Sequence, residues 1–248
     1  MPNLNMYTST NYSPNFDRKK RGPNQIKFLI FHYTGMKNEV DAIKRLTDYK
    51  SKVSSHYFIK KNGKIINLVP DLYTAWHAGI SSWQKFKSIN KYSIGIEISN
   101  SGHNFEYKNF SKKQINSTLK LSRYLIKKYK IKSKFILGHS DISPLRKKDP
   151  GEKFPWKKLY RRKIGIWNNL DSKILFNARN QKINKLEKNL FIRNLQKIGY
   201  SKNYLEKDIY YKKKLTTAFQ RRFRQELIDG IVDKECLIIS KSLIKKFV

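Results

Sequence analysis

Apolar residues in the first part of the chain fall into short segments with different periods. An almost continuous apolar run, IKFLIFHY from Ile26 to Tyr33, is typical of a buried strand. Apolar residues at helical spacing within Glu39–Tyr49 predict a helix, with Asn38 as its N-cap. Two short strands are then expected at His56–Lys60 and Lys64–Val69, because the Asn-Gly pair between them favours a β-hairpin.

Strands and helices continue to alternate up to about residue 160. SIGIEI, from Ser93 to Ile98, predicts a further strand, and Ser111–Lys130 carries the apolar stripe of a long amphipathic helix. KFILG, from Lys134 to Gly138, predicts a last short strand, and a proline-containing loop follows from Ser143 to Pro155. We therefore expect an α/β fold, in which a central mixed β-sheet is flanked by helices.

The pattern changes after Trp167, where only helical periodicity remains. A polar segment, residues 171–185, predicts a linker or a poorly fixed helix. Three helices are expected after it, at Leu186–Ile198, Lys213–Arg224 and Asp233–Phe247. The predicted organisation has three parts: a first domain at 1–170 that begins with an extended arm of about 25 residues, a linker at 171–185, and a small all-α three-helix domain at 186–248.

Composition excludes several classes of protein. The chain has 248 residues, of which 39% are apolar, so it can bury a core and is not disordered. The sequence contains no run of about 18 apolar residues, which excludes a transmembrane helix. Residues 1–24 lack the apolar segment of a secretory signal, so we expect a cytoplasmic protein, with the periplasm or cell envelope as the alternative. The single Cys236 excludes an internal disulfide and a cysteine-rich zinc site.

The charge bears on possible partners. Lysine and arginine number 54 and aspartate and glutamate 18, which gives a formal charge of +36. Such a surface favours polyanions, including nucleic acid, acidic lipid and anionic cell-wall polymer. However, the lysines are spread along the whole chain together with many asparagines and isoleucines, as a codon bias would produce. Because no zinc-finger or RNA-binding aromatic pattern accompanies them, we expect no specific nucleic-acid partner.

Three residues at or after the ends of predicted strands have the chemistry of a zinc site. His32 lies at the end of the first strand, His139 follows KFILG, and Asp149 lies ten residues further on, in RKKDPG. Two imidazoles and one carboxylate, with a fourth position left to water, form a catalytic zinc set. If the two strands are neighbours, both histidines lie over the same edge of the sheet. The alternatives are two hydrogen-bonded structural histidines and an Asp-Pro-Gly turn.

Other polar residues near these positions allow two interpretations each. Glu97 lies within an otherwise apolar strand, where a carboxylate is either functional or faces solvent. Asp141 either holds the His139 imidazole in its metal-binding tautomer or caps a turn. Lys147, two residues before Asp149, is by itself one lysine among many.

An aromatic, loop-like patch follows the predicted hairpin. Trp76 and Trp83 fit either a partly buried core or an aromatic wall for a sugar or peptide. Trp76 and His77 are the candidate substrate contacts. His56 and His103 have no supporting pattern, and we expect both to be structural or exposed.

Five segments occur in a fixed order: FHYTGM, VSSHYFI, LVPDLYTAWHAG, SIGIEISN and GHSDISPLRKKDPGEKFPW. Over about residues 12–167, they resemble the zinc-dependent N-acetylmuramoyl-L-alanine amidases, in the branch that includes the anhydromuropeptide amidases of cell-wall recycling. The resemblance implies that His32, His139 and Asp149 bind Zn²⁺ and that Glu97 and Lys147 are the catalytic pair. Some distant relatives have a tyrosine in place of Glu97, and recognition-only relatives lack the full zinc set, whereas this chain has all five residues.

The segments LQKIGY and LTTAFQRRFRQELIDGIVDKEC, within about residues 184–245, resemble the three-helix peptidoglycan-binding domain. That resemblance implies either wall binding or a structural appendage. The matching positions are Leu195, Gly199, Tyr200, Ala218, Phe219, Phe223 and Asp229-Gly230.

Together the two resemblances imply a hydrolase that acts on peptidoglycan or muropeptides. The bond cleaved would join N-acetylmuramic acid, or its 1,6-anhydro form, to L-alanine of the stem peptide. A peptidoglycan-recognition protein without turnover is the alternative, and we expect a monomer. Because the five candidate site residues all precede residue 150, the sequence also predicts that a fragment ending near residue 175 folds and acts without the helical domain.

Overall fold

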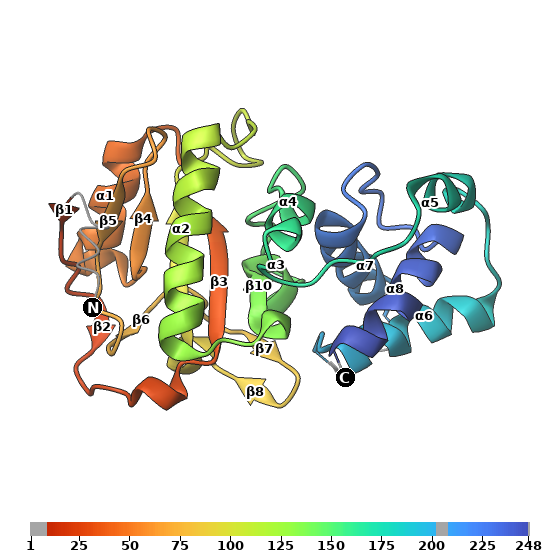
Figure 1. Cartoon of the computed structure of the whole chain (residues 1–248), viewed down its shortest axis with the longest axis horizontal. Helices are drawn as coiled ribbons and strands as arrows, with labels where there is room; N and C mark the ends of the chain where they lie inside the picture. Colours follow the sequence, from red (N-terminus) through yellow and green to blue (C-terminus); the bar gives the residue numbers. More distant parts are fainter. Residues whose placement is uncertain (1–8, 202–207, 248) are drawn as a thin grey trace.

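The computed structural model describes residues 9–201 and 208–247 and contains a six-stranded mixed sheet flanked by helices (Figure 1). The strand order is β1-β5-β4-β9-β3-β10, and β4 and β5 are the antiparallel pair. The predicted α/β fold with a C-terminal helical region is thereby confirmed. The strands of this sheet are β1 (Ser9–Thr10), β3 (Phe28–Tyr33), β4 (Tyr57–Ile59), β5 (Ile65–Asn67), β9 (Ser93–Ile98) and β10 (Ile136–Gly138).

The centre of the sheet is parallel, and this determines where the functional residues lie. Strand β3 pairs with β9 on one side and with β10 on the other, both in parallel register. His32 lies opposite Glu97, and Gly138, which directly precedes His139, lies opposite Phe31. The carboxyl ends of the three strands therefore meet at one edge of the sheet.

Two helices cover opposite faces of the sheet, as the alternation of side chains along β4 requires. Phe58 faces one side and packs with α1 (Glu39–Thr47). Tyr57 and Ile59 face the other side and belong to the main core, together with apolar residues of α2 (Lys112–Tyr129). All three strand residues are buried, which fits the nearly continuous apolar composition of the central strands.

Four helices of the described residues form a C-terminal module beside β10, next to the short helices α3 (His139–Ile142) and α4 (Trp156–Arg161) (Figure 1). The module docks onto the sheet domain through apolar packing. Trp83 is fully buried, and its ring lies 4.9 Å from that of Tyr200. The helices of the module are α5 (Ser172–Ala178), α6 (Lys185–Ile198), α7 (Ile209–Phe223) and α8 (Lys234–Phe247).

The structure adds detail in two segments for which the sequence prediction was general. Residues 171–185, predicted as a linker or a poorly fixed helix, contain helix α5, which begins after Asp171 because that side chain accepts hydrogen bonds from two backbone amides of the first turn. Residues 1–8 of the predicted arm lie outside the described residues. The described part of the arm is held by the fold, since β1 pairs with β5 and Arg21 is buried.

Four two-residue strands complete the fold as two small antiparallel sheets. They are β2 (Phe16–Asp17) with β6 (Thr74–Ala75), and β7 (Ser82–Trp83) with β8 (Phe86–Lys87). In the described ranges, 9–201 and 208–247, no helix is long and apolar enough to cross a membrane.

Candidate active site

His32, His139 and Asp149 converge at the carboxyl edge of the parallel strands. His32 Nδ1 lies 3.0 Å from His139 Nδ1 and 3.0 Å from Asp149 Oδ2, and His139 Nδ1 lies 3.0 Å from the same oxygen. All three residues are buried. The neighbouring strands β3 and β10 bring the histidines together, as the sequence predicts, and the loop after α3 returns Asp149 to them.

Hydrogen bonds on the far side of each imidazole indicate its tautomer. His139 Nε2 lies 3.1 Å from the carbonyl oxygen of Ala78, which can only accept, so Nε2 carries the proton. In the neutral ring, which is the form that binds a metal, the Nδ1 atom of His139 therefore presents a lone pair toward Asp149. Asp141, the sequence candidate for orienting this ring, instead accepts from the amide of Gly138 and caps α3, so its alternative interpretation as a capping residue is confirmed.

A chain of three hydrogen bonds orients His32 in the same way. Ser93 Oγ donates to the carbonyl of Ile89 at 2.8 Å, so it accepts from His77 Nε2, which lies 3.0 Å away. His77 Nδ1 then accepts from His32 Nε2, also at 3.0 Å. We infer that His32, like His139, has an unprotonated Nδ1. These hydrogen bonds could not be predicted from the sequence, because no local sequence pattern distinguishes Ser93 from other serines.

Three electron-pair donors thus face one another, which is the arrangement that a cation would stabilise. Burial, and then the neighbouring His139, lowers the pKa of His32 to about 4, so the ring is a neutral ligand at physiological pH. Two neutral imidazoles and one carboxylate suit Zn²⁺, whose bonds to such atoms are about 2.0–2.2 Å long.

Glu97 lies beside this group, since its position on β9 is in register with His32 on β3. Its Oε2 is buried and has no hydrogen-bond partner among the described residues. Burial, and then the charge of Asp149, raises the pKa of Glu97 well above its ordinary value, while Lys147 acts in the opposite direction. Glu97 is partly exposed, and it lines the cavity described below.

A cavity of about 400 Å³ opens over the site. All the candidate site residues line it except His32, which lies beneath it. Trp76 is half-buried in its wall, where its Nε1 donates to Asp17 Oδ1. His77 also reaches the cavity but is only 8% exposed, because it lies behind His32. The lining includes Glu97, His139, Lys147 and Asp149 as well.

Two arginines of the cavity were not anticipated from the sequence. Arg45 lies on α1, and its charge lowers the pKa of Glu97 in opposition to burial. Arg146 donates to the carbonyls of Ala78 and Ile80 and so joins the loop of Lys147 to the WHAG segment. In a chain with 54 basic residues, no local signal distinguishes these two from the others.

The remaining sequence candidates are structural. His56 is fully buried and its Nδ1 accepts from the amide of Gly95. His103 lies between the Tyr33 hydroxyl and the Glu152 carboxylate, within hydrogen-bond distance of both. Trp83 belongs to the core, which resolves the choice left open for that residue.

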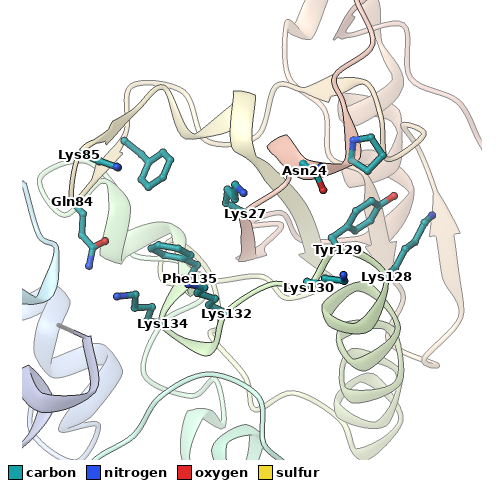
Figure 2. A pocket seen from close by; sticks show the side chains of 12 residues that line it. Asn24, Lys27, Gln84, Lys85, Lys128, Tyr129, Lys130, Lys132, Lys134 and Phe135 are labelled. Carbon is teal, nitrogen blue, oxygen red and sulfur yellow. The ribbon is translucent and has the colours of Figure 1, made fainter.

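A second, larger hollow of about 620 Å³ lies at the other end of the parallel strands (Figure 2). Figure 2 shows lysines around it from the start of β3, the end of α2 and the segment before β10. No carboxylate and no imidazole occur among the described residues that line it, so it offers no zinc ligands. The chemistry is therefore concentrated at the carboxyl edge. The lysines are Lys27, Lys85, Lys128, Lys130, Lys132 and Lys134.

Comparison with known proteins shows the family to which the chain belongs. The family described as N-acetylmuramoyl-L-alanine amidase matches residues 22–152. The N-acetylmuramoyl-L-alanine amidase AmiD of Escherichia coli is 33% identical over 238 residues, which cover 90% of this chain and 84% of that protein. The 1,6-anhydro-N-acetylmuramyl-L-alanine amidase AmpD of Haemophilus influenzae is 35% identical over 164 residues, covering 59% of this chain and 86% of that protein.

The solved structures extend the likeness to the helical module. The structure of Escherichia coli AmiD, in complex with the substrate anhydro-N-acetylmuramic acid-L-Ala-D-γ-Glu-L-Lys, superposes with a TM-score of 0.79 at 31% identity and covers 93% of each chain. The match therefore includes both the sheet domain and the C-terminal helices. On these grounds the chain belongs to the N-acetylmuramoyl-L-alanine amidase family of hydrolases.

Proposed function

We propose that this chain is a zinc-dependent amidase that cleaves the amide bond between N-acetylmuramic acid, or its 1,6-anhydro form, and L-alanine of the peptidoglycan stem peptide. The observation that carries the proposal is the buried triangle of His32 Nδ1, His139 Nδ1 and Asp149 Oδ2 beneath a cavity that also contains Glu97. The substrate named for the structurally similar AmiD complex contains such a bond.

The three residues of the triangle would hold the zinc ion. When bound, zinc supplies Lewis-acid chemistry: it polarises a carbonyl group and lowers the pKa of water. His139 and His32 are held for this purpose by the carbonyl of Ala78 and by His77, which fix the unprotonated nitrogen of each ring toward Asp149.

Glu97 is the proton carrier of the proposed reaction. Its carboxylate takes a proton from the attacking water and passes it to the leaving amine of L-alanine. A raised pKa makes Glu97 a stronger base than an exposed glutamate, and so suits it to this transfer. Lys147, in the wall of the same cavity, provides a fixed positive charge for the carbonyl oxygen that becomes negative in the transition state.

The charges of the cavity fit an anionic substrate. Arg45, Arg146, Lys147 and Lys148 line it, whereas Glu97 and Asp149 are the carboxylates of its described lining, and both are assigned to the reaction. Stem peptides carry free carboxylates that these cations would attract. Trp76 offers an apolar surface at the rim for a sugar or peptide.

The test combines metal analysis with product analysis. The purified protein is expected to hold about one zinc per chain, and a chelator should abolish release of L-alanine-terminated stem peptide from muropeptides, with activity restored by added zinc. A protein that is fully active without metal would contradict the zinc role. A protein that binds muropeptides and releases no peptide would instead be a recognition protein.

We further propose that the enzyme acts on soluble anhydromuropeptides in the cytoplasm; specific binding of the helical module to the cell wall would instead place it in the envelope. Relative rates on anhydromuropeptides and on intact sacculi test the location, since an enzyme of the envelope would prefer sacculi. Wall binding is tested by pelleting with sacculi at high salt, because a charge of +36 attracts anionic polymer at low salt without any specific contact.

A further inference from the structure

Helix α7 of the C-terminal module ends against the segments that carry two of the three proposed zinc ligands, and Figure 1 shows α7 directly beside α3. We propose that the module positions His139 and Asp149, so that the metal site reaches full affinity only while the module is docked. This inference rests on the proposed function, and it assigns to the module a role in the active site that is distinct from wall binding.

The first contact is made by Arg222 near the end of α7. Its side chain is 2% exposed, although it is charged. Nη1 donates to Asp141 Oδ2 at 2.5 Å and Nη2 donates to the carbonyl of Ile136 at 2.9 Å. The guanidinium also lies 4.1 Å from the ring centroid of Trp156. Arg222 thus binds strand β10, helix α3 and helix α4 at once.

Asp141 transmits this contact to the ligand His139. It is the third residue of α3, and His139 is the first. Asp141 Oδ2 accepts from the amide of Gly138 at 2.8 Å, and its Oδ1 accepts from the Tyr200 hydroxyl at 2.9 Å. Tyr200 also belongs to the module. Two module side chains therefore hold the carboxylate that fixes the turn on which His139 stands.

The second contact holds the segment after Asp149. Gln225, just beyond α7, donates through Nε2 to the carbonyl of Glu152 at 2.6 Å and to that of Phe154 at 2.8 Å. The two ligand segments are also joined to each other, since the amide of Ser140 donates to the carbonyl of Asp149 at 2.8 Å. Movement of the module would therefore displace both ligands.

Arg222, Tyr200 and Gln225 are positioning residues. The described lining of the active-site cavity includes none of them, so they act on the reaction only through α3 and the loop after Asp149. Residues that orient metal ligands typically contribute 10–100-fold to metal affinity. A change in zinc affinity is thus the signature that distinguishes this role from one of general packing.

The decisive variant is the double substitution Asp141→Asn with Arg222→Met. The asparagine oxygen can still accept from the Gly138 amide, and no unpaired charge is left buried, so the Arg222 contact is lost while the cap of α3 remains. Gln225→Ala removes the second contact and involves no buried charge. Lys213→Met is the matched control, because Lys213 is an exposed base of the same helix.

The readouts are the zinc dissociation constant, measured by competition with a chelating dye, and hydrogen exchange of residues 138–143 in metal-free protein. We expect zinc affinity to fall by about 10–100-fold in the double variant and by a smaller factor in Gln225→Ala, with faster exchange in both and no change in Lys213→Met. Excess zinc should restore kcat, and KM should change little.

Unchanged zinc affinity and exchange in folded variants would overturn the proposal and reduce the module to a packing partner. If the double variant does not fold, the zinc affinity and hydrogen exchange of Gln225→Ala decide whether the proposal holds. Absence of zinc binding in the unaltered protein would be a different result, since it would contradict the proposed function itself.

Discussion

At the scale of single residues, we expect substitution of Glu97 to lower kcat without loss of zinc, whereas substitution of a zinc ligand would lower zinc content. Glu97→Gln should retain zinc but lose about 10²–10⁴-fold in kcat, because it removes proton transfer and leaves the three ligands in place. Lys147→Ala should likewise keep zinc and lose rate. Metal content and steady-state kinetics on a soluble muropeptide measure both, with the exposed Lys157→Ala as the control. Zinc loss in Glu97→Gln would make Glu97 a ligand, and a near-normal rate would remove it from the mechanism.

A second residue-scale prediction concerns Asp71, a buried carboxylate outside the described lining of the active-site cavity. Burial would raise the pKa of Asp71, but hydrogen bonds from Lys128, Tyr129 and Tyr57 hold it below its ordinary value. Because the folded pKa is depressed, the charged form contributes stability above the unfolded pKa of about 3.9, and this contribution is lost as the pH falls through the folded pKa.

Asp71→Asn should therefore lower the free energy of unfolding by about 1.5–3 kcal/mol at pH 7, the usual range for hydrogen bonds to a charged group. The difference between parent and variant should shrink as the pH drops below about 4. Urea unfolding at several pH values measures it. The exposed Glu106→Gln is the control, and a difference that persists unchanged at low pH would argue that Asp71 is not charged in the folded state.

At the scale of elements, strands of about six residues and helices of about nine or more could be predicted from the sequence, whereas two-residue strands could not. Ser93–Ile98 was predicted with the bounds that the structure gives to β9, and Asn38 caps α1 as expected. The pairing of β1 with β5 involves two residues each, and so few residues have no measurable period. The arm was therefore predicted as extended chain without its place in the sheet.

The same contrast applies to the site. The sequence displays His32 near the end of one apolar strand and His139 just after another, and the pairing of β3 with β10 in the structure makes these positions neighbours. The partner of Asp141 is Arg222, 81 residues further along the chain, and local spacing carries no information about a contact over that distance. The resemblance supplied the roles of Glu97 and Lys147, which spacing alone leaves ambiguous.

Helix α2 allows a test of its predicted start. Ser111 accepts from the Gln114 amide, and the Gln114 side chain accepts in return from the Ser111 amide, which forms a capping box. Ser111→Ala should lower the free energy of unfolding by about 1 kcal/mol. Asn116→Ala, at an exposed position within the same helix, should leave it unchanged or raise it slightly, because alanine is the better helix former. Denaturant unfolding measures the free energy of unfolding of both variants, and equal values would show that the Ser111 cap contributes nothing to stability.

At the scale of the whole molecule, the sheet domain and the helical module share one core. Trp83, Phe154, Phe219 and Phe247 belong to a single buried cluster although they come from both parts of the chain. The buried pair of Arg222 and Asp141 lies across the same boundary. The sequence suggested two units, because all candidate catalytic residues precede residue 150, but it does not show these contacts.

Truncation near residue 175 is therefore expected to damage the enzyme, contrary to the expectation from sequence alone. Removal of the module takes away the Arg222 contact of Asp141 and exposes Trp83, so apolar surface that is buried in the full chain would meet water. The fragment should unfold at lower temperature, hold zinc less tightly and cleave soluble muropeptides more slowly than the full chain. Co-expression of residues 176–248 as a separate chain should restore part of each property, because the contacts require docking and not the covalent link. A fragment with unchanged zinc affinity and full soluble activity would show that the module is an independent appendage after all.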